Sequence, residues 1–344
     1  MNPIIKSNAL KLFPLRKSLL LTACCLLLLP AMQGCSPIYK TGTPPAVTPE
    51  PTVLDEPGEF EVNELDGRMQ NDFGTYNATL YYPASPGTYP AIAFSPGLGA
   101  VKGYYRWVGN HLASHGYTVL LFTVPVPLTA STAQHQAGFV SAFEWLEAEN
   151  GNPDSPVYGQ IDLNQRGIMG HSLGGAAASR AAQSMDIDAV VALAPGAPGD
   201  LVQTIRTATT PIDLKDAIAA GLATITAPTQ IQAATQDCIT GDLWDAAYYQ
   251  ALTAESRQFV LINGGNHVSF NDAGSLANTA GQAFDCKAVV DTREHHQRLS
   301  RRYFTAWFDY FLKNDTAVAP YIFGSMAEQD LASGLVSALE FELP

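Results

Sequence analysis

Ser172 lies at the centre of Gly170-His171-Ser172-Leu173-Gly174, a pattern that can turn a serine into a nucleophile. A strand-like stretch precedes it, and small residues that favour a tightly packed helix follow it. Such a serine sits on a sharp strand-to-helix turn, where flanking glycines let the two elements approach closely. The turn aims the Leu173 amide and the positive helix end at the same point. We predict that Ser172 attacks a carbonyl carbon and that Leu173 N–H helps to stabilise the resulting oxyanion.

His267 is the histidine best placed to activate this serine. After Ser172, histidines occur only at positions 267, 295 and 296. His267 follows a strand-like stretch, 258–262, and a short loop, where a general base is expected in the order nucleophile, acid, base. It would take the serine proton and later return it to the leaving group.

Asp237 is the candidate acid that would orient the His267 ring. It follows the strand-like stretch 229–234 and lies 30 residues before His267. Asp242 and Asp245 are alternatives, although both lie near the start of an expected helix, where aspartate often serves as a cap. The third group holds the imidazole tautomer and stabilises the imidazolium.

A second oxyanion donor is expected in the loop Ser95-Pro96-Gly97-Leu98-Gly99. This loop ends an early strand, and its glycines permit a close approach to the nucleophile. The main-chain N–H of Leu98 is the candidate donor.

The elements that must position these residues alternate between strand and helix. Short, apolar, β-rich stretches suit strands buried on both faces. They indicate an α/β fold, a mostly parallel sheet covered by helices on both faces, in one catalytic domain, 58–313. The strands are expected at 79–82, 91–95, 118–123, 167–170, 189–193, 229–234 and 258–262, and the helices at 104–114, 132–149, 174–183, 243–253 and 293–313. His295 and His296 begin the last helix, and we expect a solvated helix end there.

The N-terminus has the proportions of an export signal. Four basic residues precede a short leucine-rich run, so residues 1–34 are predicted to be a signal peptide. Gly34-Cys35 resembles the end of a bacterial lipoprotein box, and a lipid on Cys35 would anchor the protein to a membrane. Ordinary cleavage and a retained signal anchor remain alternatives. We expect export to the bacterial cell envelope or secretion.

The segment after the signal is predicted to be an extended tether, 35–57, because residues 36–57 hold six prolines. Residues 314–344 are interpreted as a C-terminal extension without chemistry of its own.

Cysteine usage fits an oxidising compartment. The chain has five cysteines, and Cys238 and Cys286 remain as a pair once the signal and Cys35 are set aside. Bridging them would close a loop worth roughly 4 kcal/mol in the chain-entropy model. Two free thiols are the alternative. No metal-ligand spacing is evident, so neither a metal nor an organic cofactor is expected.

The overall charge argues against nucleic acid as a partner. The formal net charge is -13, and phosphate binding needs a basic face. An uncharged ester, small or polymeric, is compatible with this charge.

Together these motifs resemble the bacterial cutinase and polyester-hydrolase branch of the α/β-hydrolases, which is close to dienelactone hydrolase-like and platelet-activating-factor acetylhydrolase-like enzymes. The resemblance covers roughly 65–312. It is carried by Ser95-Pro96-Gly97, Leu112-Ala113-Ser114-His115-Gly116-Tyr117, Gly170-His171-Ser172-Leu173-Gly174-Gly175, Pro228-Thr229 and Ile262-Asn263-Gly264-Gly265-Asn266-His267.

The resemblance implies a serine esterase in which Ser172, Asp237 and His267 form the triad and the amides of Leu98 and Leu173 form the oxyanion hole. Polyester hydrolases usually carry an aromatic residue where this chain has Leu98. The stretch 196–227 is longer than the corresponding link in that family and is expected to form a small cap. A phospholipid acetylhydrolase, a serine peptidase and a non-catalytic surface binding protein remain alternatives.

Overall fold

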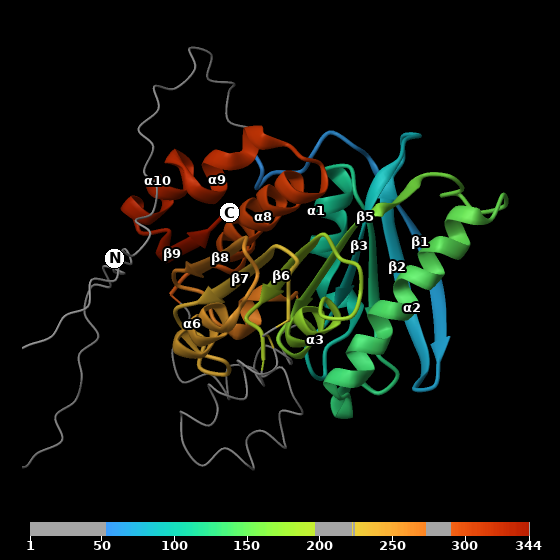
Figure 1. Ribbon diagram of the computed structural model, residues 1–344, viewed down its shortest axis with the longest axis horizontal. Coiled ribbons are helices and arrows are strands. Elements are labelled where there is room, and N and C mark those ends of the chain that lie inside the picture. Colours follow the sequence, from blue (N-terminus) through green and yellow to red (C-terminus); the bar gives the residue numbers. More distant parts are fainter. Residues whose placement is uncertain (1–52, 197–221, 223, 273–289, 344) are drawn as a thin grey trace, which may run out of the picture. The chain divides into compact units, whose positions relative to one another are not determined.

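The computed structural model describes residues 53–196, 222, 224–272 and 290–343 (Figure 1). The chain divides into two units, Met1–Pro51 and Thr52–Pro344, and every described residue belongs to the second unit. The predicted signal peptide, most of the predicted tether and most of the predicted cap, 196–227, therefore lie outside the described residues.

A single nine-stranded sheet forms the centre of the described part, in the order β1-β2-β4-β3-β5-β6-β7-β8-β9. The six strands from β4 to β8 in this order run parallel, whereas β1, β2 and β9 pair antiparallel at the two edges. The predicted fold class is thus confirmed. The strands are β1 Val62–Asn71, β2 Gly74–Pro83, β3 Tyr89–Ser95, β4 Thr118–Thr123, β5 Ile161–His171, β6 Ala189–Leu193, β7 Thr229–Ala234, β8 Arg257–Ile262 and β9 Val336–Glu342.

Helices cover both faces of this sheet (Figure 1). One apolar core joins the sheet to α2 Thr132–Gly151, α3 Leu173–Ala181 and α6 Asp242–Ala251. A second core joins the opposite face to α1 Arg106–Ser114, α8 Arg293–Leu312 and α9 Ala319–Phe323. The central strands are buried on both faces, and their sequences are accordingly largely apolar, although β7 carries the buried Gln230 and Gln232.

Shorter elements complete the described part of the chain. Helix α10, Ser325–Ser333, follows α9 and leads into β9. The 3₁₀ turns are η1 Lys102–Tyr105, η2 Pro127–Thr129, η3 His267–Phe270 and η4 Thr316–Val318. Three of them, η1, η2 and η3, follow the carboxyl ends of parallel strands, where the loops of an α/β sheet form ligand sites.

The expectation of a solvated end for α8 is wrong at His296. This side chain is fully buried, and its ring lies against Phe270 with centroids 4.4 Å apart. Burial lowers the pKa of His296 to about 3, so the ring stays neutral. The first turn of α8 packs beneath the loop that carries His267, which a helical apolar stripe alone could not reveal.

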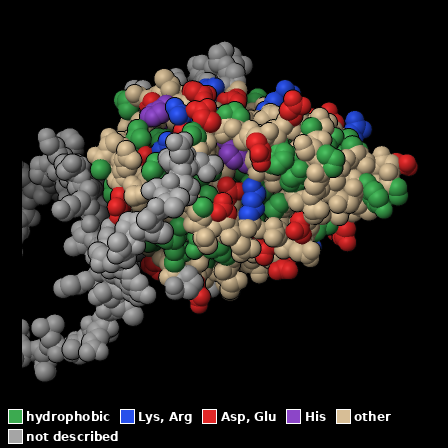
Figure 2. Space-filling view, turned by 90° about the horizontal axis from the view of Figure 1, so that it is seen from above, with side chains coloured by type: hydrophobic (Ala, Val, Ile, Leu, Met, Phe, Trp, Pro, Cys, Tyr) green, Lys and Arg blue, Asp and Glu red, His purple; other side chains and the backbone are tan. Residues whose placement is uncertain are grey.

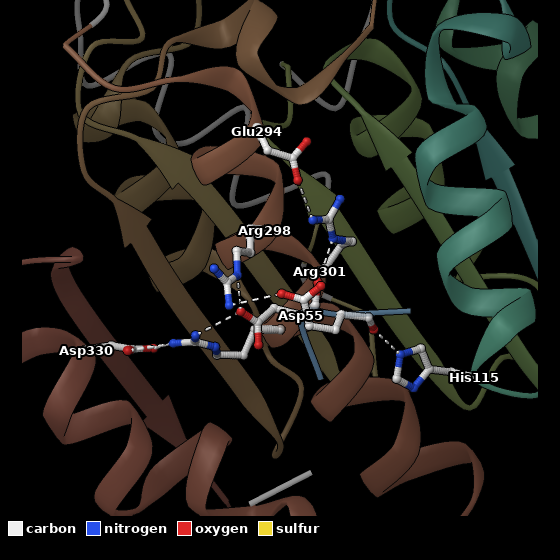
Figure 3. Close-up of polar contacts among 8 residues, drawn as sticks. Asp55, His115, Glu294, Arg298, Arg301 and Asp330 are labelled. Atoms are coloured by element: carbon white, nitrogen blue, oxygen red, sulfur yellow. Dashed lines mark hydrogen bonds and ion pairs between the residues drawn. The ribbon is translucent and has the colours of Figure 1, made fainter. Parts of the chain in front are cut away.

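Residues just after the start of the second unit are held on α8 by charge (Figure 3). Asp55 is 2% exposed and accepts hydrogen bonds from Arg298 Nε at 2.5 Å and from Arg302 Nη2 at 3.1 Å. Arg302 also binds both oxygens of Asp330, on α10, at 2.7 and 2.8 Å. Arg302 thereby links the beginning of this unit, within the segment assigned to the tether, to its C-terminal region.

Candidate active site

All three predicted triad residues follow the carboxyl ends of parallel strands. Ser172 comes directly after β5, Asp237 three residues after β7, and His267 five residues after β8. Because neighbouring parallel strands end at the same edge of a sheet, the topology brings these residues to one edge.

Ser172 occupies the strained turn that the sequence predicts. Its backbone has φ 54° and ψ -120°, a conformation that residues with a Cβ rarely adopt. Two hydrogen bonds hold it: its N–H donates to the Leu193 carbonyl at 2.9 Å, and its own carbonyl accepts from Gly196 N–H at 3.0 Å. The sharp turn therefore follows from the packing of β5 between its neighbours and α3.

The glycines of the motif are required by close backbone contacts. A Cβ on Gly170 would collide with the backbone of Gly174, and a Cβ on Gly174 would collide with the carbonyls of Ser95 and Pro96. Strand, helix and the loop after β3 meet here without room for side chains.

Asp237 and His267 form a buried hydrogen-bonded pair. His267 Nδ1 lies 2.8 Å from Asp237 Oδ2, and the two residues are 5% and 3% exposed. With the Nδ1 proton donated to the carboxylate, Nε2 is the atom available to a nucleophile.

Hydrogen bonds from the following turn fix the Asp237 carboxylate. The amides of Ile239 and Thr240 donate to Oδ1 at 2.7 and 3.1 Å, and Thr240 Oγ1 donates to Oδ2 at 2.8 Å. Burial alone would raise the pKa of Asp237, but the charge of His267 and these donors hold it well below its ordinary value. Asp237 is therefore ionised at neutral pH.

Of the two alternative acids, Asp245 is fully buried and contacts Thr240. Its Oδ2 lies 3.4 Å from Thr240 Oγ1, whereas His267 Nδ1 lies 2.8 Å from Asp237 Oδ2. The side chain of Asp242 lies outside the described part of the chain.

The two predicted oxyanion donors flank Ser172 on separate segments. Leu173 is the first residue of α3, and Leu98 follows Gly97, whose added Cβ would lie 3.0 Å from Ser172 Cβ. The Leu98 side chain is 51% exposed, and the predicted donor is its main-chain N–H. Gly196 also lies close, since an added Cβ there would be 3.6 Å from Leu173 N.

The structure adds two buried histidines that the sequence analysis did not place in the site. The His171 ring lies 4.6 Å from the His267 ring, centroid to centroid, and Tyr105 Oη lies 2.8 Å from His171 Nδ1. His135 Nδ1 lies 2.7 Å from the hydroxyl of Ser95, the first residue of the predicted oxyanion loop. His171 was visible as a member of the serine motif, but its contact with Tyr105 has no local sequence signal.

The covalent modifications predicted for cysteines stay predictions. Cys35 and Cys286 lie outside the described residues, while Cys238 directly follows Asp237. Within the described ranges, no helix has the length and apolar character needed to cross a membrane. Those ranges also contain no group of three or more His, Cys, Asp or Glu residues suited to a metal ion.

Acidic side chains dominate the charged surface of one face. Figure 2 shows them scattered among apolar patches, with few basic side chains between them. This distribution agrees with the net charge of -13 and suits a neutral substrate better than a polyanion.

Comparison with known proteins places these features in a family. Residues 38–224 match the family described as PET hydrolase-like. Cutinase 2 of Thermobifida cellulosilytica is 25% identical over 268 residues, which cover 77% of this chain and 84% of that protein. Cutinase 1 of the same organism is 32% identical over 139 residues, covering 40% of this chain and 52% of that protein.

A third relative is named for a defined ester. The bis(hydroxyethyl) terephthalate hydrolase of Streptomyces coelicolor is 29% identical over 170 residues, covering 48% of this chain and 52% of that protein. The family match extends over more than half of the sequence, and the protein is therefore a carboxylic ester hydrolase that belongs to the PET hydrolase-like family.

Proposed function

We propose that this enzyme cleaves carboxylic esters through an acyl-enzyme formed on Ser172. The observation that carries the proposal is the buried 2.8 Å pair of Asp237 and His267 at the same sheet edge as the strained serine. A hydrolase that uses a serine needs this pair to hold the imidazole tautomer and to stabilise the imidazolium.

The proposed reaction has two halves. His267 Nε2 takes the Ser172 proton as the serine oxygen bonds to the carbonyl carbon, and the oxyanion is met by the amides of Leu98 and Leu173. The tetrahedral intermediate collapses, the C–O bond to the alcohol breaks, and the alcohol leaves with the proton from His267. Water, deprotonated by His267, then attacks the acyl-enzyme and releases the acid and the free serine.

The substrate is proposed to be a neutral ester with an apolar body. Exposed apolar side chains border the oxyanion loop: Leu98 is 51% exposed and Leu128, on η2, is 79% exposed. The two loops are joined because Gly99 N–H donates to the Pro127 carbonyl at 2.8 Å. Such a surface suits a small aryl or alkyl ester or the surface of a polyester, as the names of the relatives also suggest.

An ester panel tests this proposal. Wild type and Ser172→Ala are assayed on p-nitrophenyl esters of increasing chain length, bis(hydroxyethyl) terephthalate, a polyester film, an oxidised phospholipid and a peptide amide. We expect the highest kcat/KM on neutral esters and a loss of at least about 10³-fold in Ser172→Ala. Ser184→Ala, on the segment after α3, is the matched control and should behave as wild type.

Other outcomes of this panel identify other functions. Preferential cleavage of the oxidised phospholipid or the amide would replace the proposed substrate class with a phospholipid acetylhydrolase or a serine peptidase. A folded wild type without turnover on any substrate would favour a surface binding protein.

We further propose that a bridge between Cys238 and Cys286 pins the loop that carries the acid. Cys238 directly follows Asp237, so a crosslink there would restrict the carboxylate. Full reduction should lower the Tm of wild type and leave the Tm of Cys238→Ser/Cys286→Ser unchanged. Equal responses of the two proteins would contradict the bridge.

We also propose that the protein is exported and that Cys35 carries a lipid. The support is the leucine-rich run after four basic residues and the Gly34-Cys35 pair. Metabolic labelling with a fatty acid should mark wild type and spare Cys35→Ala. Label on both proteins, or on neither, would contradict lipidation at this residue.

A further inference from the structure

We propose that Tyr105 is a positioning residue. Its hydroxyl group holds three segments in fixed positions relative to one another: the oxyanion loop, the turn that carries Ser172 and the loop that carries His267. The inference rests on the proposed function, because it assigns Tyr105 a part in that reaction. It draws on contacts that the proposed triad does not use.

Tyr105 ends η1 and is fully buried between two parts of the site. Its ring lies 4.7 Å from the Phe94 ring, centroid to centroid. Its hydroxyl oxygen lies 2.8 Å from His171 Nδ1 and accepts a long hydrogen bond, 3.5 Å, from Gly97 N–H. It also has a hydrogen bond to the side chain of Asn271, the residue after η3.

The donors and acceptors around this oxygen assign the protons. Gly97 N–H donates to the oxygen, so the Tyr105 hydroxyl still has its own proton to donate, and His171 Nδ1 lies 2.8 Å away as an acceptor. The hydroxyl proton of Tyr105 is then directed to His171 Nδ1. Burial raises the pKa of Tyr105, so this proton stays on the phenol.

His171 carries the effect to the base. With Nδ1 accepting, the imidazole is neutral and its remaining proton is on Nε2. The ring packs on both His267, with centroids 4.6 Å apart, and Phe270, with centroids 5.6 Å apart. Burial and the neighbouring charge of His267 hold the pKa of His171 well below its ordinary value. A neutral ring here does not repel the imidazolium that His267 becomes during the reaction.

The oxyanion loop has little room to move, so loss of the hydrogen bond that holds it should affect catalysis. A Cβ added to Gly97 would lie 3.0 Å from Ser172 Cβ and 3.3 Å from His171 Nδ1, so the loop already lies in contact with the nucleophile turn. Leu98, the proposed oxyanion donor, is the next residue. Misplacing a catalytic group by about 1 Å can cost about 10²-fold in rate.

Tyr105→Phe removes the hydroxyl group and keeps the buried ring. We expect kcat on a soluble p-nitrophenyl ester to fall by about 10- to 100-fold, with KM within about twofold of wild type. The rate constant of labelling by a fluorophosphonate should fall in parallel. Hydrogen exchange of the backbone amides in residues 96–100 should become faster, a readout that does not depend on turnover.

Tyr117→Phe is the matched control. Tyr117 is equally buried and donates to Asp309 Oδ1 at 2.7 Å, before β4 at the opposite end of the sheet. Tyr117→Phe should lower Tm by about as much as Tyr105→Phe does, but kcat and the hydrogen-exchange rates of residues 96–100 should stay at their wild-type values. Gln in place of His171 tests the pathway, because the Tyr105→Phe and His171→Gln effects on kcat should be less than additive.

Two results would overturn this role. Tyr105→Phe could keep wild-type kcat and loop exchange, or Tyr117→Phe could lose as much kcat as Tyr105→Phe. The proposed function would be contradicted by other results: a wild type that hydrolyses no ester, or a Ser172→Ala variant that keeps activity. In that case, hydrogen exchange of residues 96–100 still decides whether Tyr105 holds the loop.

Discussion

The buried pair of His135 and Ser95 makes the stability of this enzyme depend on pH. His135 is fully buried, and its Nε2 has no hydrogen-bond partner among the described residues. Burial lowers the pKa of His135 to about 4, whereas an unfolded histidine has a pKa of about 6.5. Between these values the unfolded chain binds more protons than the folded one.

The sign and size of the effect follow from this difference. The stabilisation is fully present above about pH 6.5 and is lost as the pH falls toward about 4. From pH 7 to pH 5 the loss attributable to His135 is about 2 kcal/mol. Other buried histidines, including His296, add to the slope of the whole protein in the same direction.

His135→Gln isolates this contribution, since a glutamine amide can still bond to Ser95 but does not titrate. Urea unfolding of wild type and variant at pH 7 and pH 5 gives the two free energies of unfolding. We expect the variant to lose about 2 kcal/mol less than wild type over this interval. Parallel pH dependences of the two proteins would refute the assignment of a neutral His135.

Three further predictions concern the site and its frame. Asp237→Asn should lower kcat by about 10³- to 10⁴-fold with little change in Tm, measured on a soluble ester, because the imidazole loses its orienting carboxylate; a loss below tenfold would contradict the role. Gly97→Ala should lower kcat and change KM less, because the added Cβ would lie 3.0 Å from Ser172 Cβ and displace the nucleophile. An unchanged kcat would contradict that contact. Arg302→Met should lower the free energy of unfolding, measured in urea, by about 3 kcal/mol, because the buried carboxylates of Asp55 and Asp330 lose their shared partner. A change below about 0.5 kcal/mol, the size of an ordinary surface substitution, would contradict this prediction.

The sequence predicts the interior of the sheet well because that interior has a simple physical signature. The expected strands 118–123, 189–193 and 229–234 coincide with β4, β6 and β7. These strands are buried on both faces and are largely apolar apart from the glutamines of β7, and they are bounded by polar or glycine-containing turns, so their ends are sharply marked.

The edges of the sheet give a weaker signal and were not predicted. Strand β1 alternates half-buried with exposed residues and carries several charged side chains, so no apolar run marks it. Strand β9 lies in 314–344, which was interpreted as an extension, and it pairs antiparallel with β8. Pairing with a distant strand, rather than local propensity, makes these segments strands.

The residues of the candidate site likewise fall into those with a local sequence signal and those without one. Ser172, Asp237 and His267 could be proposed because each follows a recognisable strand in the expected order. Tyr105 and His171 are separated by 66 residues and meet only through the folded chain. The burial of His296 likewise depends on the loop packed over the first turn of α8.

Reaction with a fluorophosphonate tests most directly whether His267 activates Ser172, with the mass of the protein and peptide mapping as the readouts. We expect one phosphonyl group per chain, located on Ser172, in wild type, and none in Ser172→Ala. We also expect much slower labelling of His267→Ala, because the hydroxyl then lacks its base. Modification at another residue, or an undiminished rate without His267, would contradict a serine activated by this histidine.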